Sequence, residues 1–427
     1  MTAFFSRAGT PSSAQLGAKA FYAVIFFNAV IDLGHKITLQ NTVFKVHDGS
    51  YQIILIAIIN ALILLPYIAL VIPVGRVANR MPKPAMIKIA AWFSFALTLL
   101  ITLFYRLGWF WPAMAMTLFM AVQSAFYSPA KLAYLKILFG KDRLSEANGM
   151  AQAIVIAGIL FGTLLFSIGF EYLYQLLPAI NNTSAINKDM VTATMWLLGL
   201  GLSSLALIQL AFVYRIPEKP ELLEEERVNA TPRVSIFYLL KDKRLLIPVL
   251  GLALFWSVGQ GMLAAFPAFA KAHAGISNAA VIQGILASTA LGIAVGAFLV
   301  GKFSKSTVNL KLVPIGVTGL AIGLWSLTFL NSAQAFASAY GLMGISSAFL
   351  IVPLNAYIQW QAAENTLGGV IAASNFFQNI AMLAMLGLTI AFALANFDSQ
   401  HLLQMMALLT TVVGGAIAWA VLRFDQL

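Results

Sequence analysis

The sequence has 427 residues, of which 60% are hydrophobic and only 10% charged, with a net charge of +11 and a mean hydropathy of +0.87. A soluble protein is roughly 45–50% apolar and about 25% charged, so this chain has more apolar surface than a core can bury. The absence of cysteine excludes disulfides, thiolate nucleophiles and Cys-ligated metals. The composition indicates a polytopic membrane protein.

Twelve apolar segments are long enough to cross a bilayer, since a helix needs about 20 apolar residues to span roughly 30 Å of hydrocarbon. They have no alternating polar period, which excludes a β-barrel. The chain is polar until about Lys19, so we expect no cleavable signal peptide. The sequence predicts an all-α membrane protein, with spans at 20–44, 51–74, 85–105, 109–127, 147–175, 190–214, 246–270, 278–300, 311–330, 334–353, 368–394 and 400–422.

The distribution of Lys and Arg predicts the orientation of the helices. With the N-terminus in the cytoplasm, the inner loops carry about five times as many basic residues as the outer loops. The outer loops then hold only Lys45, Arg106, Lys188 and Lys271. We therefore expect a bacterial inner-membrane protein with both termini cytoplasmic. The basic charge is explained by topology, and we expect no nucleic-acid partner.

A polar segment near the middle of the chain divides the expected spans six and six. It contains Pro217, Pro220 and the acidic run Glu221–Glu226. The sequence thus predicts an N-terminal six-helix bundle at 1–214, a cytoplasmic linker at 215–245 and a C-terminal six-helix bundle at 246–427.

Two weak internal repeats support a duplicated architecture. Gly75–Arg80 follows the second span and Gly301–Lys305 follows the eighth, an offset of 226. Ser128–Lys131 ends the fourth span and Val352–Asn355 ends the tenth, an offset of 224. Duplicated halves related by an axis along the membrane normal are typical of transporters that bind their substrate between the halves.

The segment Gly75–Arg80 resembles the loop signature of the major facilitator superfamily, in which Gly, Asp and Arg join the second and third helices. Gly75 would permit a tight turn, and Arg80 could meet a helix C-terminus or an acid. Asn79 stands where the signature usually has Asp. These three residues are candidate gating residues, although a basic inner loop with one Gly is also common in membrane proteins.

Polar residues within the first span are candidates for substrate binding. Asn28, Asp32 and Lys36 are spaced four apart and share one helix face, and His35 lies beside them. A charge at the bilayer centre costs at least roughly 2.5–3.5 kcal/mol, so such groups are functional candidates. The alternative is that Asp32 and Lys36 neutralise one another and only position the helix.

Further candidates lie in the second half, where Gln260 falls in the seventh span, and Asn375, Gln378 and Asn379 in the eleventh. Interhelical hydrogen bonds explain such amides as readily as a polar cavity does. We expect the three Gly-xxx-Gly pairs only to permit close helix packing; they are Gly158/Gly162, Gly292/Gly296 and Gly319/Gly323. No phosphate loop, zinc pair or nucleophile elbow occurs, so we expect no enzyme activity and no cofactor.

Three segments resemble one branch of the superfamily, the bacterial lysophospholipid transporters. Ala125–Lys131, followed by Glu146–Met150, is similar to the family's YSPAK and ANG segment. Phe349–Ala356 resembles its VVPLNA segment, and Ala381–Gly387 its eleventh-helix ending. Asp32 falls where the family has an acidic residue in the first helix.

The resemblance implies an activity and a partner. Such transporters move lysophospholipids, chiefly lysophosphatidylethanolamine, from the outer to the inner leaflet, and a cytoplasmic acyltransferase and acyl-carrier-protein synthetase system reacylates them. Since the chain ends at Leu427 without that enzyme, we expect a separate partner, and we expect the transporter to be a monomer in the lipid bilayer. Lys131 would contact a lipid phosphate or lock the cytoplasmic side, or else serve as an ordinary inner-side anchor.

The sequence departs from the family pattern at three charged or polar positions. The family has Asn after the first-helix acid, a base on the seventh helix and an acid on the eleventh; here these positions are Leu33, Leu263 and Asn379. Lys36 and His35 could replace the lost cation. Two other functions stay open: a proton-coupled exporter of amphipathic drugs, with Asp32 as proton carrier, and an inactive scaffold for lipid-remodelling enzymes.

Overall fold

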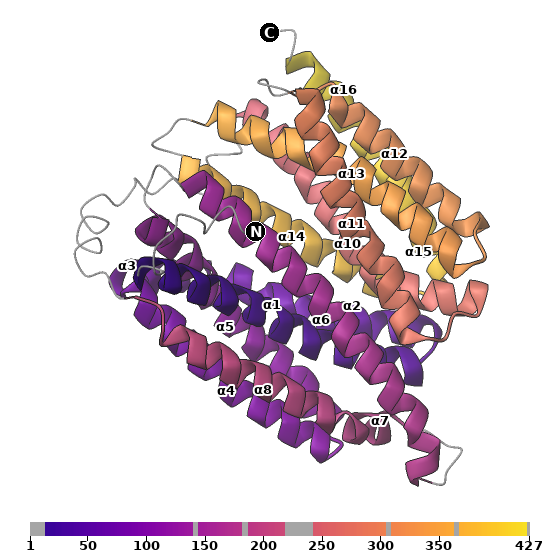
Figure 1. The fold of residues 1–427 in the computed structure, drawn as a ribbon. Helices are drawn as coiled ribbons and strands as arrows, with labels where there is room; N and C mark the ends of the chain where they lie inside the picture. The colour runs from indigo at the N-terminus through magenta and orange to yellow at the C-terminus, as the bar shows by residue number, and fades with distance from the viewer. Residues whose placement is uncertain are drawn as a thin grey trace. The chain divides into compact units, whose positions relative to one another are not determined.

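The computed structural model describes residues 13–139, 144–181, 187–217, 242–304, 309–362 and 367–424. Within these ranges the chain forms helices joined by turns, without any strand (Figure 1). The chain divides into two compact units, Met1–Thr42 with Ala69–Ala230 and Val43–Ile68 with Thr231–Leu427. The expected division at the 215–245 linker stays a prediction.

Unit 1 contains most of the first helix and the helices that follow the second. In Figure 1, α4 and α8 of this unit lie side by side. Its described helices are α1 (Ser13–Val46), whose last residues belong to unit 2, α3 (Val71–Arg80), α4 (Lys83–Arg106), α5 (Phe110–Phe139), α6 (Leu144–Asn181), α7 (Lys188–Thr194) and α8 (Trp196–Val213).

Unit 2 combines the second helix with the helices of the C-terminal half. Helix α13 packs against both α11 and α12. Its described helices are α2 (Gly49–Ala69), α10 (Lys243–Ala274), α11 (Ala279–Ser304), α12 (Leu312–Ser326), the 3₁₀ turn η3 (Leu327–Phe329), α13 (Ala333–Gln361), α14 (Leu367–Leu394), α15 (Ser399–Leu409), the π-helical turn η4 (Thr410–Gly414) and α16 (Gly415–Phe424).

Eleven of the twelve expected spans coincide with described helices that are long and apolar enough to cross a membrane. The remaining expected span, 109–127, lies in the 30-residue helix α5, whose apolar character is reduced by Pro112, Gln123 and Ser124. The all-α prediction is therefore confirmed for the described residues.

Several helices begin where a polar side chain can accept a bond from an otherwise unpaired backbone N–H. Asn187 accepts from Met190 at the start of α7, and Asp398 accepts from His401 at the start of α15. Asp242 and Ser332 cap α10 and α13 in the same way. A residue next to each helix therefore stabilises the point at which the helix begins.

The expected turn at Gly75 is wrong. Residues 71–80 form helix α3, which continues the second span beyond a break at Leu70, and the chain turns only at Met81 and Pro82. Pro82 precedes α4 and Pro84 lies in its first turn, where its missing N–H is tolerated. The connection between the second and third spans is thus shorter than the motif suggested.

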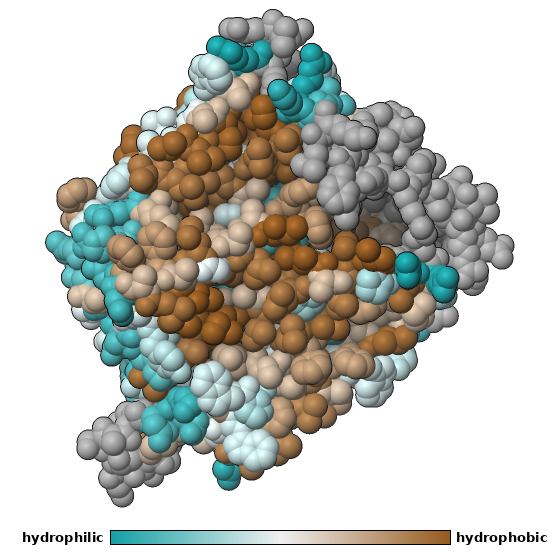
Figure 2. Space-filling view, turned by 180° about the vertical axis from the view of Figure 1, so that it is seen from behind, coloured by the Kyte–Doolittle hydropathy of each residue, from teal (hydrophilic) through white to brown (hydrophobic). Residues whose placement is uncertain are grey.

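The surface of both units exposes large apolar side chains, as a membrane protein requires. Ile168 on α6 is 60% exposed, and Phe298 on α11 and Leu342 on α13 are 74% and 65% exposed. Figure 2 shows apolar groups covering broad areas of the face in view. In water such areas would favour aggregation, whereas lipid solvates them.

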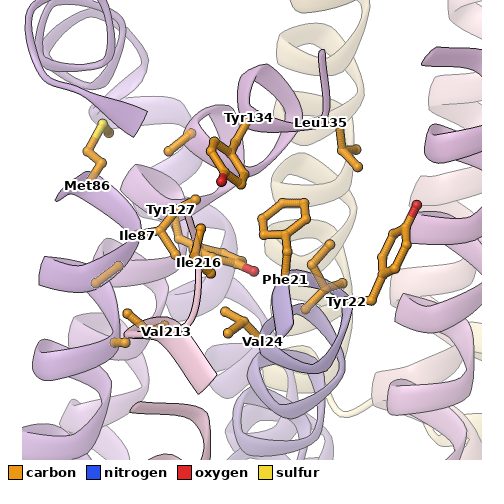
Figure 3. Close-up of a cluster of buried hydrophobic side chains, with 14 of the residues drawn as sticks. Phe21, Tyr22, Val24, Met86, Ile87, Tyr127, Tyr134, Leu135, Val213 and Ile216 are labelled. Carbon is orange, nitrogen blue, oxygen red and sulfur yellow. The ribbon is translucent and has the colours of Figure 1, made fainter. Parts of the chain in front are cut away.

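A cluster of buried aromatic and aliphatic side chains holds the helices of unit 1 together (Figure 3). The rings of Phe21 on α1 and Tyr134 on α5 meet edge to face, with centroids 5.0 Å apart. The Tyr134 hydroxyl donates to the carbonyl of Pro217 at 2.6 Å, which ties the chain after α8 to the same cluster. Tyr127, at 3% exposure, connects this cluster to the polar residues of α1 and α5 described below.

The Gly-xxx-Gly pairs lie at close helix contacts, as the sequence predicted. A Cβ on Gly158 would lie 2.9 Å from the carbonyl oxygen of Phe26, and one on Gly296 would lie 2.6 Å from that of Ile345. Because backbone cannot yield as a flexible side chain can, only Gly fits these two positions.

Candidate functional site

The polar centre of unit 1 is Asp32 on α1. Its Oδ2 accepts a hydrogen bond of 2.7 Å from the Ser124 hydroxyl on α5 and one of 2.9 Å from the Asn28 amide, one turn earlier on α1. Among the residues that the structure describes, no donor reaches the buried Oδ1. The carboxylate therefore keeps one oxygen available to a ligand.

Amide side chains surround Asn28 and fix its orientation. Gln123 on α5 and Gln209 on α8 donate to Asn28 Oδ1, at 3.5 and 3.3 Å. With its oxygen engaged in this way, the Asn28 amide nitrogen points to Asp32. The side chains that position this carboxylate therefore come from three helices, α1, α5 and α8.

Lys131 is a cation that acts electrostatically on Asp32. It lies on α5, is half-buried, and has its Nζ 5.8 Å from the centroid of the Tyr127 ring. Tyr127 is buried, and no described group bonds its hydroxyl. Lys131 therefore stands beside the Asp32 cluster as well as near the inner end expected for α5.

Lys36 does not pair with Asp32. It is half-buried one turn further along α1, and within the described ranges it makes neither a hydrogen bond nor an ion pair. The alternative that Asp32 and Lys36 neutralise one another is thus not what this structure shows for the described residues. Helical spacing brings two side chains to one face, but it does not require them to bond.

His35 lies among protein groups and not beside Asp32. It is 1% exposed, and its Nδ1 lies 2.8 Å from the Tyr105 hydroxyl on α4. Its Nε2 lies 3.3 Å from the Thr117 hydroxyl on α5. Since both ring nitrogens are engaged, His35 joins three helices and has no free nitrogen to offer a substrate.

The candidates in unit 2 lie on two neighbouring helices, α10 and α14. Gln260 on α10 has a buried Oε1 that no described donor reaches. On α14, Gln378 donates to the Ser374 hydroxyl at 2.8 Å, and both side chains are buried. Asn375 is exposed and Asn379 half-buried, so the polar residues of α14 fall into two groups and do not all point one way.

An apolar groove of about 510 Å³ is lined by residues of α10, α14 and the consecutive elements α15, η4 and α16 of unit 2. Leu250, Leu388 and Ile417 are among its lining residues. Ser257 is the one hydroxyl among them, and it bonds to the carbonyl of Ala253 at 2.6 Å. The groove therefore offers apolar contact and no free hydrogen-bonding group.

The candidate gating residues lie on α3. Arg80 is exposed in its last turn, and the surroundings of Gly75 and Asn79 are not among those that the structure describes. Their gating role stays a prediction.

Sequence comparison defines the family. The profile of the Major Facilitator Superfamily matches residues 20–386, which is most of the chain. The chain belongs to the major facilitator superfamily. This superfamily member is 29% identical over 352 residues to the lysophospholipid transporter LplT of Enterobacter sp. (strain 638), covering 80% of this chain and 79% of the relative. It is 26% identical over 389 residues to that of Serratia proteamaculans (strain 568), covering 88% and 89%.

Solved structures share the major facilitator fold. One is a POT family transporter in complex with 5-aminolevulinic acid, with a TM-score of 0.68 at 14% identity, covering 94% of this chain and 95% of that one. Another is the nucleoside transporter NupG, with a TM-score of 0.68 at 11% identity, covering 95% and 99%. At such identities the likeness concerns the fold alone.

The sequence did not single out Ser124, Gln123 or Gln209 as site residues. The available signal was spacing, because Ser124 and Lys131 are two turns apart on one helix, with Tyr127 between them. Gln209 gave no such signal, since it lies 181 positions from its partner Asn28.

Proposed function

We propose that this chain is a lysophospholipid transporter that moves its substrate from the outer to the inner leaflet of the bacterial cytoplasmic membrane. The names of its relatives support the substrate class. The direction, and reacylation by a separate cytoplasmic acyltransferase, rest on the family resemblance. Alternating access by two six-helix halves, 1–214 and 246–427, would carry the headgroup across.

The observation that best supports this proposal is that two charged side chains on α1 keep hydrogen-bonding capacity that no described residue uses. Asp32 keeps a buried, unbonded oxygen, and Lys36 has no partner among the described residues. One helical turn separates them, about 6 Å along the axis at 1.5 Å per residue. Lysophosphatidylethanolamine carries an ammonium and a phosphate a few ångströms apart, so Asp32 would accept from the ammonium and Lys36 would donate to the phosphate.

Electrostatics favour such a headgroup over a neutral one. In a low-dielectric site two close opposite charges attract more strongly than in water, and this attraction would offset part of the cost of removing the headgroup from water. The ammonium would also replace part of the influence of Lys131 on Asp32. Binding would thus change the charge balance at α5 as well as at α1.

Leaflet-resolved transport tests this function directly. The purified protein in vesicles should move lysophosphatidylethanolamine between leaflets faster than protein-free vesicles, and lysophosphatidylglycerol and lysophosphatidylcholine should reveal the headgroup preference. A rate equal to that of protein-free vesicles for all three lipids would reject the proposal.

Proton-coupled export of amphipathic drugs is the second candidate. The buried position of Asp32 within a hydrogen-bonded cluster favours it, because such an acid can carry a proton. Efflux of an amphiphilic dye that collapses with the proton gradient, without lysolipid movement, would support this function. An adjacent acyltransferase gene would instead favour lysolipid transport.

A further inference from the structure

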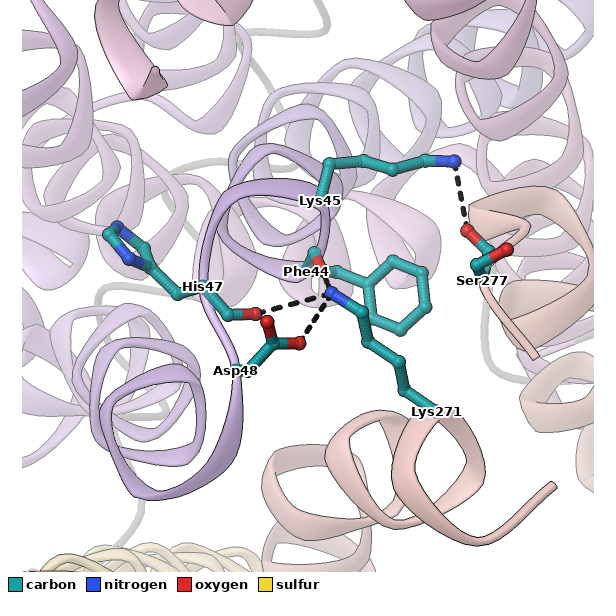
Figure 4. A network of polar contacts seen from close by, with 6 residues as sticks. All are labelled: Phe44, Lys45, His47, Asp48, Lys271 and Ser277. Carbon is teal, nitrogen blue, oxygen red and sulfur yellow. Dashed lines mark hydrogen bonds and ion pairs between the residues drawn. The ribbon is translucent and has the colours of Figure 1, made fainter. Parts of the chain in front are cut away.

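A lysine near the C-terminal end of α1 and one near that of α10 each donate hydrogen bonds to backbone carbonyls of the other segment. All these residues belong to unit 2. Lys45, in the last turn of α1, donates to the carbonyl of Ser277, just beyond α10, at 2.8 Å. Lys271, in the last turn of α10, donates to the carbonyl of Phe44 at 2.9 Å and to that of His47 at 3.5 Å. Figure 4 shows the two side chains reaching in opposite directions.

Lys271 is the more fully engaged of the two lysines. Its Nζ also lies 2.7 Å from Asp48 Oδ1 and 5.2 Å from the centroid of the Phe44 ring. A lysine ammonium has three donors, and here three oxygens surround it. The Lys271 side chain is 23% exposed, whereas that of Asp48 is 77% exposed. The carbonyl bonds are therefore better shielded from water than the ion pair.

The position of Lys271 follows from helix electrostatics. The last carbonyls of a helix lack partners within it, and they carry partial negative charge. Two helix C-termini that approach each other repel unless cations lie between them. Lys271 supplies such a cation to the end of α1, whereas Lys45 bonds a carbonyl in the connection between α10 and α11.

The two lysines are related by the internal repeat, although the carbonyls that they bond are not. Lys271 lies 226 positions after Lys45, the same offset that separates Gly75 from Gly301 in the internal repeat. The two lysines thus occupy equivalent positions at the ends of the first helix of each repeat.

We propose that Lys45 and Lys271, with their acceptors Phe44, His47, Asp48 and Ser277, form a lysine clasp that holds the ends of α1 and α10 together and is released when these ends separate during transport. The charge pattern predicts that these ends face outward. The clasp goes beyond the proposed substrate, and its test uses no lipid substrate.

A single cysteine in this cysteine-free chain reports the opening. Val43 is 1% exposed beside the clasp, so Val43→Cys should react slowly with a maleimide in the full-length protein in lipid nanodiscs. Lys271→Met should raise its labelling rate about tenfold, because labelling follows the local opening equilibrium. Lys45→Met should raise it less, and the control Lys188→Met, which removes an outer lysine of unit 1, should leave it unchanged.

A second comparison separates the clasp from an ordinary ion pair. Asp48→Ala removes the carboxylate but leaves the carbonyl bonds of Lys271, so its effect should be clearly smaller than that of Lys271→Met. Equal increases of the labelling rate in these two variants would overturn the clasp. Wild-type labelling rates in both single variants, Lys45→Met and Lys271→Met, would also overturn it. If Lys271→Met does not reach the membrane folded, Lys45→Met alone decides, and a wild-type rate in it rejects the proposal.

Discussion

Ser124 on α5 donates a hydrogen bond of 2.7 Å to Oδ2 of Asp32 on α1, and Asn28 bonds the same oxygen. Both donors are therefore on one side of the carboxylate, and the buried Oδ1 has no partner among the described residues. This asymmetry fixes the direction in which Asp32 can meet a ligand.

Asp32→Asn should reduce transport of lysophosphatidylethanolamine roughly 10–100-fold, because a hydrogen bond to a charged group contributes about 1.5–3 kcal/mol. Lysophosphatidylglycerol, which has no ammonium, should be affected less. Leaflet-resolved transport of both lipids measures the difference, with membrane protein levels as the control for folding. An identical loss for every headgroup would contradict the role assigned to Asp32.

Lys36→Ala should reduce transport of all phosphate-bearing lysolipids to a similar extent, because phosphate is the group they share. Lys19→Ala is a matched control on the same helix, since Lys19 is exposed; it should transport normally. Vesicle transport with three headgroups checks this expectation. Normal transport by Lys36→Ala would mean that this lysine only helps to position α1.

Lys131→Ala should lower transport several-fold, because it removes a cation that acts on Asp32. Lys136→Ala, five residues further along the chain and equally basic, should have no such effect. Both variants would be compared in the same transport assay at equal protein level. Equal losses would indicate ordinary inner-side anchoring by both lysines.

His35→Leu should destabilise the protein more than it impairs transport per folded molecule. It leaves the hydroxyls of Tyr105 and Thr117 without their bonds to the ring, and each unsatisfied buried group costs about 1–3 kcal/mol. Thermal unfolding in detergent should show a lower midpoint. If the variant had unchanged stability but no transport, His35 would be a substrate-binding residue instead.

The orientation can be tested with single cysteines in the cysteine-free chain. With an impermeant thiol reagent on intact cells, a cysteine at Asn182 should be labelled and one in the 215–245 linker should not. Both positions are taken from the charge pattern, since residues 182 and 218–241 lie outside the described ranges. Labelling in the linker but not at Asn182 would contradict the predicted topology.

Most of the fold was predictable because length and apolar character alone determine which segments span a bilayer. The Asn28–Asp32 contact was predictable too, since residues four apart on a helix are neighbours. The same rule suggested an Asp32–Lys36 pair that does not form, because spacing fixes the face and not the rotamer.

Contacts between helices were the part that sequence could not supply. Ser124 and Gln209 reach α1 from other helices, and nothing in their local sequence identifies their partners. His35 looked like a ligand group because it is polar within a span, yet Tyr105 and Thr117 engage both its nitrogens. The helical course of Gly75 was missed because a glycine permits a turn without requiring one.

The assignment of residues 43–68 to unit 2 has a consequence for a severed chain. Cleavage in the linker would leave α2 covalently attached to the N-terminal fragment, although it packs as part of the other unit. The two fragments would not be self-sufficient, because one carries a helix that completes its counterpart. When the two fragments are expressed together as separate polypeptides, they should associate through α2. The C-terminal fragment expressed alone should be less stable than the N-terminal fragment.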